Sequence, residues 1–110
     1  MEILDSKEND MDVFKLIGRL DSNTSPDLEK KIFNAIENGA VNMILDFENL
    51  DYISSAGLRV ILKATKDLKR SDGMVVLCSM QDYVKEVFEI AGFDSFLPIA
   101  SNMDGALKMF

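Results

Sequence analysis

Asp51-Tyr52-Ile53-Ser54-Ser55-Ala56-Gly57-Leu58-Arg59 is the stretch that decides the fold of this chain. It follows an apolar run at Val41–Phe47 and leads into Leu58–Leu68, where apolar residues recur at helical spacing. A strand that is apolar on both faces belongs inside a sheet that helices cover. The stretch therefore predicts a buried strand, then a loop that carries two serines, then a helix.

Toward the N-terminus, the pattern predicts a hairpin followed by a helix. Short strands are expected at Glu2–Ser6 and at Val13–Ile17, with the polar turn Lys7–Asp10 between them. Ser25 is the expected cap of the first helix, with Pro26 at its first position. Asn38-Gly39 is expected to end that helix, because glycine suits the residue after a helix C-terminus.

Toward the C-terminus, the alternation of strands and helices continues. A second apolar strand is predicted at Met74–Cys78, and a short edge strand at Phe96–Ile99. Two further helices are expected, with these residues facing inward: Val84, Val87, Phe88 and Ala91 in one, and Ala106, Leu107 and Phe110 in the other. The chain is thus predicted to form one α/β domain over residues 1–110. Its central sheet should be mixed but mostly parallel, with about five strands and about four helices.

Composition excludes several classes of function. The 110 residues carry a net charge of −7, which disfavours nucleic acid and anionic membranes as partners. Histidine is absent, so no Ser-His-Asp or Cys-His site can form within the chain. The single cysteine, Cys78, lies in an apolar run and is expected to be a buried hydrophobe. No apolar run approaches the ~20 residues of a membrane span, and the acidic N-terminus is no secretory signal, so we expect a cytoplasmic protein.

The two serines at the helix start allow a structural role and a functional one. One serine is enough to cap a helix, so Ser54 is the expected cap and Ser55 is left with a free hydroxyl. Gly57 is unusual inside a helix, where glycine costs about 1 kcal/mol relative to alanine. Two reasons for it remain open: close approach of another body to the surface, or tight packing within the domain.

Other readings of this region are weaker. The first glycine of a Gly-x-Ser-x-Gly elbow is missing, and so is the Gly-Lys-Ser/Thr core of a phosphate loop. The spacing of Asp46, Glu48 and Asp51 fits no calcium loop, so these acids are interpreted as an acidic rim rather than a metal site. Arg59 and Lys63 belong either to a solvated helix face or to a surface that docks a partner.

Two motifs resemble the anti-sigma factor antagonists, or STAS domains. The first is the stretch from Leu50 to Leu62 after a strand that ends in Asp46, and the second is Gly18-Arg19-Leu20-Asp21. The resemblance implies a partner switch. The unmodified antagonist binds an anti-sigma factor, a serine kinase of the GHKL ATPase type, and so releases a sigma factor. The kinase phosphorylates a serine or threonine at the helix start, the antagonist lets go, and a phosphatase resets it.

Carried over to this chain, the resemblance makes Ser55 the phosphate acceptor, with Ser54 as second choice. Ala56 stands where some members carry their acceptor, and Ser54 replaces a family aspartate. The implied protein is not an enzyme and needs neither cofactor nor metal. The expected partner-binding residues are Asp21, Ser22, Asn23, Ser54, Ser55, Ala56, Gly57, Arg59 and Lys63.

Two alternatives remain. A STAS-like scaffold, or an accessory subunit of a transporter or signalling complex, would use the same loop without phosphorylation, and Ala56 favours this reading. A small enzyme or an acyl carrier would use a serine covalently. The apolar strands speak against a carrier, which is a helical bundle, and the absence of histidine speaks against a hydrolase.

Overall fold

The computed structural model describes residues 1–110, and its centre is a five-stranded sheet. The strands are β1 (Glu2–Glu8), β2 (Met11–Leu20), β3 (Asn42–Ile53), β4 (Met74–Cys78) and β5 (Ile99–Ala100). They lie across the sheet in the order in which they occur along the chain. β1 is antiparallel to β2, and the other neighbouring pairs are parallel. The predicted mixed, mostly parallel sheet is confirmed.

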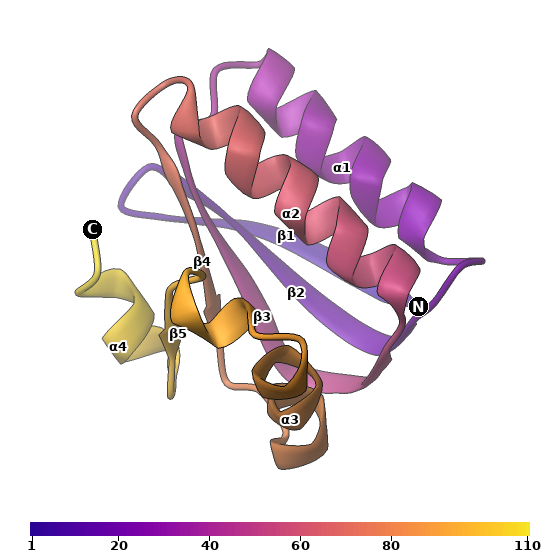
Figure 1. The fold of residues 1–110 in the computed structure, drawn as a ribbon. Helices are drawn as coiled ribbons and strands as arrows, with labels where there is room; N and C mark the ends of the chain where they lie inside the picture. The colour runs from indigo at the N-terminus through magenta and orange to yellow at the C-terminus, as the bar shows by residue number, and fades with distance from the viewer.

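Helices cover the two faces of the sheet unequally. They are α1 (Ser25–Glu37), α2 (Ser55–Lys69), α3 (Asp82–Ile90), the short 3-10 helix η1 (Phe93–Ser95) and α4 (Met103–Leu107). Residues of α1, α2 and α3 pack into the larger core on one face, whereas Ala106 of α4 packs into a smaller core on the other. α1 and α2 lie side by side, well apart from α4 (Figure 1). Right-handed crossovers that advance in one direction across a sheet leave successive helices on the same face. No helix combines the length and apolarity that a membrane crossing requires.

The N-terminal hairpin is confirmed, but its turn is shorter than predicted. Lys7 pairs with Asp12 and Glu8 with Met11, so both strands extend into the segment that was expected to be a turn. Only Asn9 and Asp10 form the turn, with φ of 51° and 66°. Two consecutive positive φ angles are typical of the two-residue turn whose twist matches the flanking strands.

β3 is longer than predicted, and this corrects the placement of the motif. The strand continues beyond Phe47 and pairs with the end of β2, from Ile17 opposite Asn49 to Leu20 opposite Ile53. Two irregularities interrupt the register, and at the first of them the Asp46 carboxylate accepts a hydrogen bond from the Glu48 backbone N–H at 3.0 Å. Each irregularity adds one residue to β3, so that Leu50 and then Ile53 are buried again. Asp51–Ile53 is therefore strand rather than loop.

The end of α1 matches its sequence signal, but its start does not. The predicted cap of α1 is wrong, because Thr24 is the N-cap and Ser25 is the first helical residue. Ser25 is buried, and its hydroxyl donates to the Asp21 backbone carbonyl at 2.5 Å. The end of α1 at Asn38 is confirmed, and Gly39 follows in the left-handed region with φ of 98°.

The C-terminal elements are shorter than predicted. β5 begins after Pro98 rather than at Phe96, since proline has no N–H for the ladder. Ala91 is exposed beyond the end of α3. α4 ends at Leu107, so Phe110 lies outside it and is 40% exposed, although it was expected to face inward. Ala106 is buried and Leu107 half-buried, as predicted.

Cys78 ends β4 without any exposed surface. Burial, together with the negative charges of Asp46 and Glu48, raises the pKa of its thiol to about 11. The reactive form of cysteine is the thiolate, so this thiol is an inert part of the smaller core, as expected.

Candidate functional site

Ser54 is the only residue between β3 and α2. Its backbone N–H donates to the Leu20 carbonyl at 2.9 Å, which ties the start of α2 to the end of β2. Its hydroxyl accepts a hydrogen bond from the Gly57 N–H at 3.4 Å, and its backbone is extended. These are the properties of an N-cap, so the predicted capping role of Ser54 is confirmed.

Ser55 is the first residue of α2, and its side chain is exposed. No other group in the structure hydrogen-bonds to its hydroxyl, because Ser54 already serves as the cap. The first N–H groups of a helix and the positive end of its dipole favour a negative charge nearby. A partner can therefore reach a free hydroxyl at a position that tolerates an anion.

Gly57 faces the core, which corrects its assignment to the partner-binding surface. It is buried, and a methyl group built on it would lie 2.7 Å from Leu20 Cγ and 3.1 Å from Ile53 Cγ1. Both distances are shorter than ordinary carbon contacts. Of the two reasons that the sequence left open for this glycine, tight packing within the domain is the one that the structure supports.

Asp21 organises the turn between β2 and α1. One of its carboxylate oxygens accepts hydrogen bonds from the Asn23 N–H at 3.0 Å and the Thr24 N–H at 3.1 Å. The bond from Asn23 is the largest influence on the pKa of this carboxyl and holds it below its usual value. Arg19 lies 3.8 Å from the other oxygen. Ser22 and Asn23 are exposed on the same turn.

This turn and the serine motif, Ser54–Gly57, lie close together because β2 and β3 are parallel neighbours. Leu20 is paired with Ile53, so the residues that follow them emerge at the same end of the sheet. A groove of about 610 Å³ runs between α1 and α2, and it is lined by four of the predicted residues, Ser22, Ala56, Arg59 and Lys63. The other predicted residues, Asp21, Asn23, Ser54, Ser55 and Gly57, lie outside the lining.

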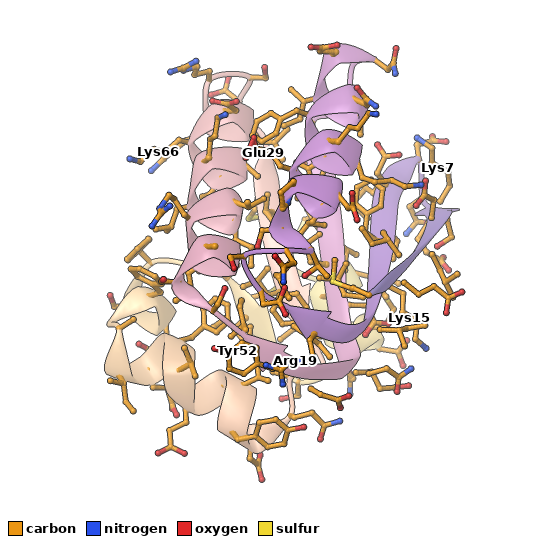
Figure 2. All side chains as sticks on the ribbon, turned by 90° about the vertical axis from the view of Figure 1, so that its right-hand side faces the viewer. Lys7, Lys15, Arg19, Glu29, Tyr52 and Lys66 are labelled. Atoms are coloured by element: carbon orange, nitrogen blue, oxygen red, sulfur yellow. The ribbon has the colours of Figure 1, made fainter.

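The structure adds residues that were not among the predicted partner-binding residues. Lys63 lies 3.8 Å from a Glu29 carboxylate oxygen and 4.8 Å from the centre of the Phe33 ring. Phe33 follows the buried Ile32 directly and borders the apolar face of α1, a position that could have marked it as a lining residue. Arg19 lies 4.2 Å from the centre of the Tyr52 ring, two residues before Ser54 in the chain, and both side chains are labelled in Figure 2.

The proposed acidic rim is only partly correct. Asp46 is paired with Lys15 and Ile53 with Leu20, so this part of β3 spans the length of five β2 residues, and Asp46 lies roughly 20 Å from Ser54 at about 3.3 Å per residue. Glu48 is paired with Lys15 at 3.6 Å. No group of three His, Cys, Asp or Glu side chains could hold a metal ion. Only Asp21 and Asp51 remain as acids close to the serines.

Comparison with known proteins supplies the family. Residues 4–106 match the STAS domain. The chain belongs to the STAS domain family. Over 110 residues this STAS domain is 38% identical to BtrV of Bordetella bronchiseptica, which is named as an anti-sigma factor antagonist. That match covers 100% of this chain and 95% of BtrV.

Solved structures share the fold of this STAS domain. A Thermotoga maritima protein described as an anti-sigma factor antagonist superposes with a TM-score of 0.93 at 19% identity, over 97% of this chain and 92% of that one. The Bacillus cell fate determinant SpoIIAA in its phosphorylated form superposes with a TM-score of 0.77 at 22% identity, over 99% of this chain and 100% of that one. At these identities the likeness shows the fold alone.

Asp21 provides a pH-dependent test of the turn in this STAS domain. Asp21→Asn keeps an oxygen acceptor but removes the charge, so the variant should melt at a lower temperature than the wild type at neutral pH. Because folding lowers the pKa of this carboxyl, the contribution of the charge is present above its ordinary pKa and lost as pH falls through the folded-state pKa.

The measurement is a series of thermal melts of both proteins from neutral to strongly acidic pH. The two melting temperatures should converge at the acidic end. A gap that stays constant across the whole range would show that the charge of Asp21 does not stabilise the turn.

Proposed function

We propose that this STAS domain is an anti-sigma factor antagonist that acts by partner switching. In its unmodified form it binds an anti-sigma factor that is a serine kinase of the GHKL type, and a sigma factor is released. Phosphorylation of Ser55 ends this binding, and a phosphatase restores it. The protein is thus a kinase substrate and binding module rather than an enzyme, works in the cytoplasm and needs no cofactor.

The observation that carries the proposal is the division of roles between the two serines. Ser54 is held as the cap of α2, whereas Ser55 is exposed and its hydroxyl has no partner. A phosphoryl group on Ser55 adds about −1.5 to −2 charges at a helix start, where an anion is favoured. The fold of the domain is therefore expected to persist in the phosphorylated state. The relatives support this reading, since BtrV is named as an antagonist and SpoIIAA occurs in a phosphorylated form.

The partner-binding surface is proposed to surround Ser55. It includes the exposed turn at Ser22 and Asn23, with Asp21 holding the turn in place. On α2 it includes Ala56, Arg59 and Lys63, which lie on the side that faces α1. A phosphate at the centre of this surface would add bulk and charge to a contact region without refolding the domain.

Incubation with the cognate kinase and ATP, followed by mass spectrometry, tests the proposal. The wild type should gain one phosphate, and peptide mapping should place it on Ser55. Ser55→Ala should gain none. Ser54→Ala is the matched control and should still be phosphorylated, although loss of the cap is expected to destabilise it by up to ~1 kcal/mol.

The same experiment distinguishes the alternatives. A phosphate on Ser54 in the wild type would move the acceptor by one residue. Binding to the kinase without any phosphate transfer would favour a scaffold that uses the same loop. Ala56 is the observation behind that second candidate, because it lines the groove without offering a hydroxyl.

A further inference from the structure

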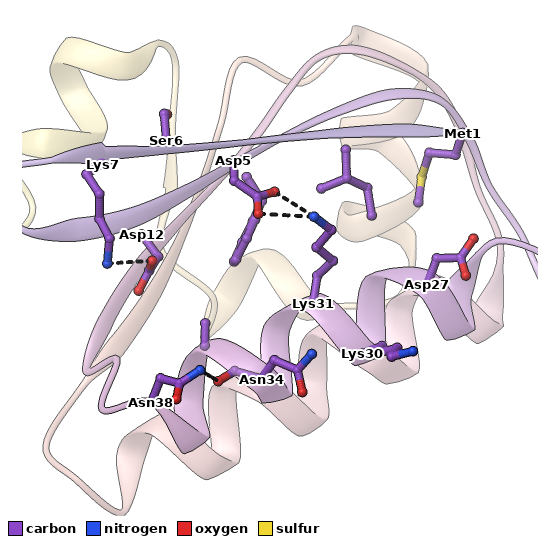
Figure 3. A pocket seen from close by; sticks show the side chains of 13 residues that line it. Met1, Asp5, Ser6, Lys7, Asp12, Asp27, Lys30, Lys31, Asn34 and Asn38 are labelled. Carbon is purple, nitrogen blue, oxygen red and sulfur yellow. Dashed lines mark hydrogen bonds and ion pairs between the residues drawn. The ribbon is translucent and has the colours of Figure 1, made fainter.

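The largest cavity of the molecule lies away from the serine motif. It has a volume of about 810 Å³ and lies between β1 and α1 (Figure 3). Its lining has three cations and three acids, so it carries no excess charge, and two of the cations are paired: Lys31 with Asp5 at 3.1 Å and Lys7 with Asp12 at 2.8 Å. A charged partner would have to break these pairs, so this cavity is a poor candidate for recognition.

The groove between α1 and α2 differs in its charge. Three cations line it, Lys30, Arg59 and Lys63, together with a single acid, Glu29. Arg59 is exposed, and no carboxylate lies within ion-pair distance of it. The groove thus carries a local excess of positive charge in a chain whose net charge is −7. A concentration of the minority charge in one groove favours an acidic partner.

Apolar groups form the rest of the lining. Phe33 is half-buried on the α1 side of the groove, and Ala56 and Val60 line it from α2. Lys63 lies over the Phe33 ring, so a cation and an aromatic surface are presented together. An apolar side chain of a partner that entered this groove would be shielded from water on several sides. Desolvated pockets of this kind are found at the centre of protein interfaces.

We propose that this groove binds an acidic segment of the anti-sigma factor kinase, with one apolar side chain of that segment inserted against Phe33. The proposal rests on the proposed function, because the kinase provides the segment. It also suggests how Ser55 acts on the groove without lining it. Ser55 and Arg59 are four residues apart on α2, where side chains are neighbours, so a phosphate on Ser55 would compete for the Arg59 guanidinium.

Charge reversal on α2 tests the groove. Arg59→Glu and Lys63→Glu should each weaken the binding of the unphosphorylated domain to the kinase by roughly tenfold. The loss should be larger at low ionic strength. Lys66→Glu is the matched control, because Lys66 lies on the same helix and points away from α1 (Figure 2). It should change the dissociation constant less than twofold. Isothermal titration calorimetry with the full chain gives the constants, and thermal melts confirm that each variant is folded.

An NMR titration of the isotope-labelled wild type with the kinase separates the possible failures. Shifts of the Phe33, Ala56 and Lys63 amides, together with the affinity losses, support the proposal. Binding with shifts elsewhere, or equal losses for the Lys63 and Lys66 variants, would overturn the groove and leave the proposed function standing. No binding at all would overturn the proposed function and the groove with it.

Discussion

Ser55→Asp is expected to weaken binding to the anti-sigma factor kinase by about 100-fold, which corresponds to roughly 2.8 kcal/mol. The substitution places a fixed negative charge at the centre of the proposed contact surface. It also places that charge beside Asp21 and Asp51 and one helical turn before Arg59. If this charge is desolvated in the interface without a partner, it costs several kcal/mol, and if it pairs with Arg59 instead, the kinase loses a favourable contact.

The same substitution should leave the fold intact. Ser55 is exposed at the first position of α2, where the helix dipole favours an acid, so the melting temperature should stay within a few degrees of the wild-type value. Ser55→Asn is the control, because it has nearly the size of aspartate without the charge. Calorimetric titration of all three proteins gives the affinities. Equal affinity of the Asp and Asn variants would show that charge at this position does not drive release.

Gly57→Val is expected to have the largest effect on stability, a loss of about 3 kcal/mol in the free energy of unfolding. Even the first added carbon would overlap the Leu20 side chain at 2.7 Å, and the two methyl groups of valine extend further toward Leu20 and Ile53. Both neighbours are buried, so neither can move aside cheaply. The higher helix propensity of valine returns only about 0.5 kcal/mol.

Ala56→Val is the matched control for this prediction. It makes a comparable increase in volume one residue earlier on α2, but its side chain lines the open groove rather than the core. Its cost should stay below about 1 kcal/mol, mainly from the lower helix propensity of valine. Urea unfolding of the three proteins measures the difference. Similar losses for the two variants would contradict the assignment of Gly57 to the core.

The sequence predicted those helices and strands correctly that have one apolar face or two. Met74–Cys78 is a strand with the predicted bounds, and Leu58–Leu68 lies within α2. The second half of β3 was not predicted, because two irregularities shift its apolar alternation and Glu48 and Asp51 are exposed. That half is a strand because it pairs with the end of β2, and a pairing partner leaves no local mark in the sequence.

The candidate site shows the same division. The Ser54 cap was predictable because capping involves only neighbours in the chain, here the N–H of Gly57. The free hydroxyl of Ser55 followed from it. The role of Gly57 was not predictable, because it depends on Leu20, which is brought to it across the β2–β3 pair.

By itself, then, the sequence determined the order and type of most elements, the α/β class and the position of the serine motif at a helix start, because these depend on contacts between residues close in the chain. Only the tertiary structure decided which side of α2 each motif residue faces. Gly57 meets the core, Ser55 meets solvent, and Ala56 and Arg59 line a groove whose other wall is α1. That groove exists because two helices from distant parts of the chain pack on the same face of one sheet, and only this packing brings the cations of α2 beside Phe33 of α1.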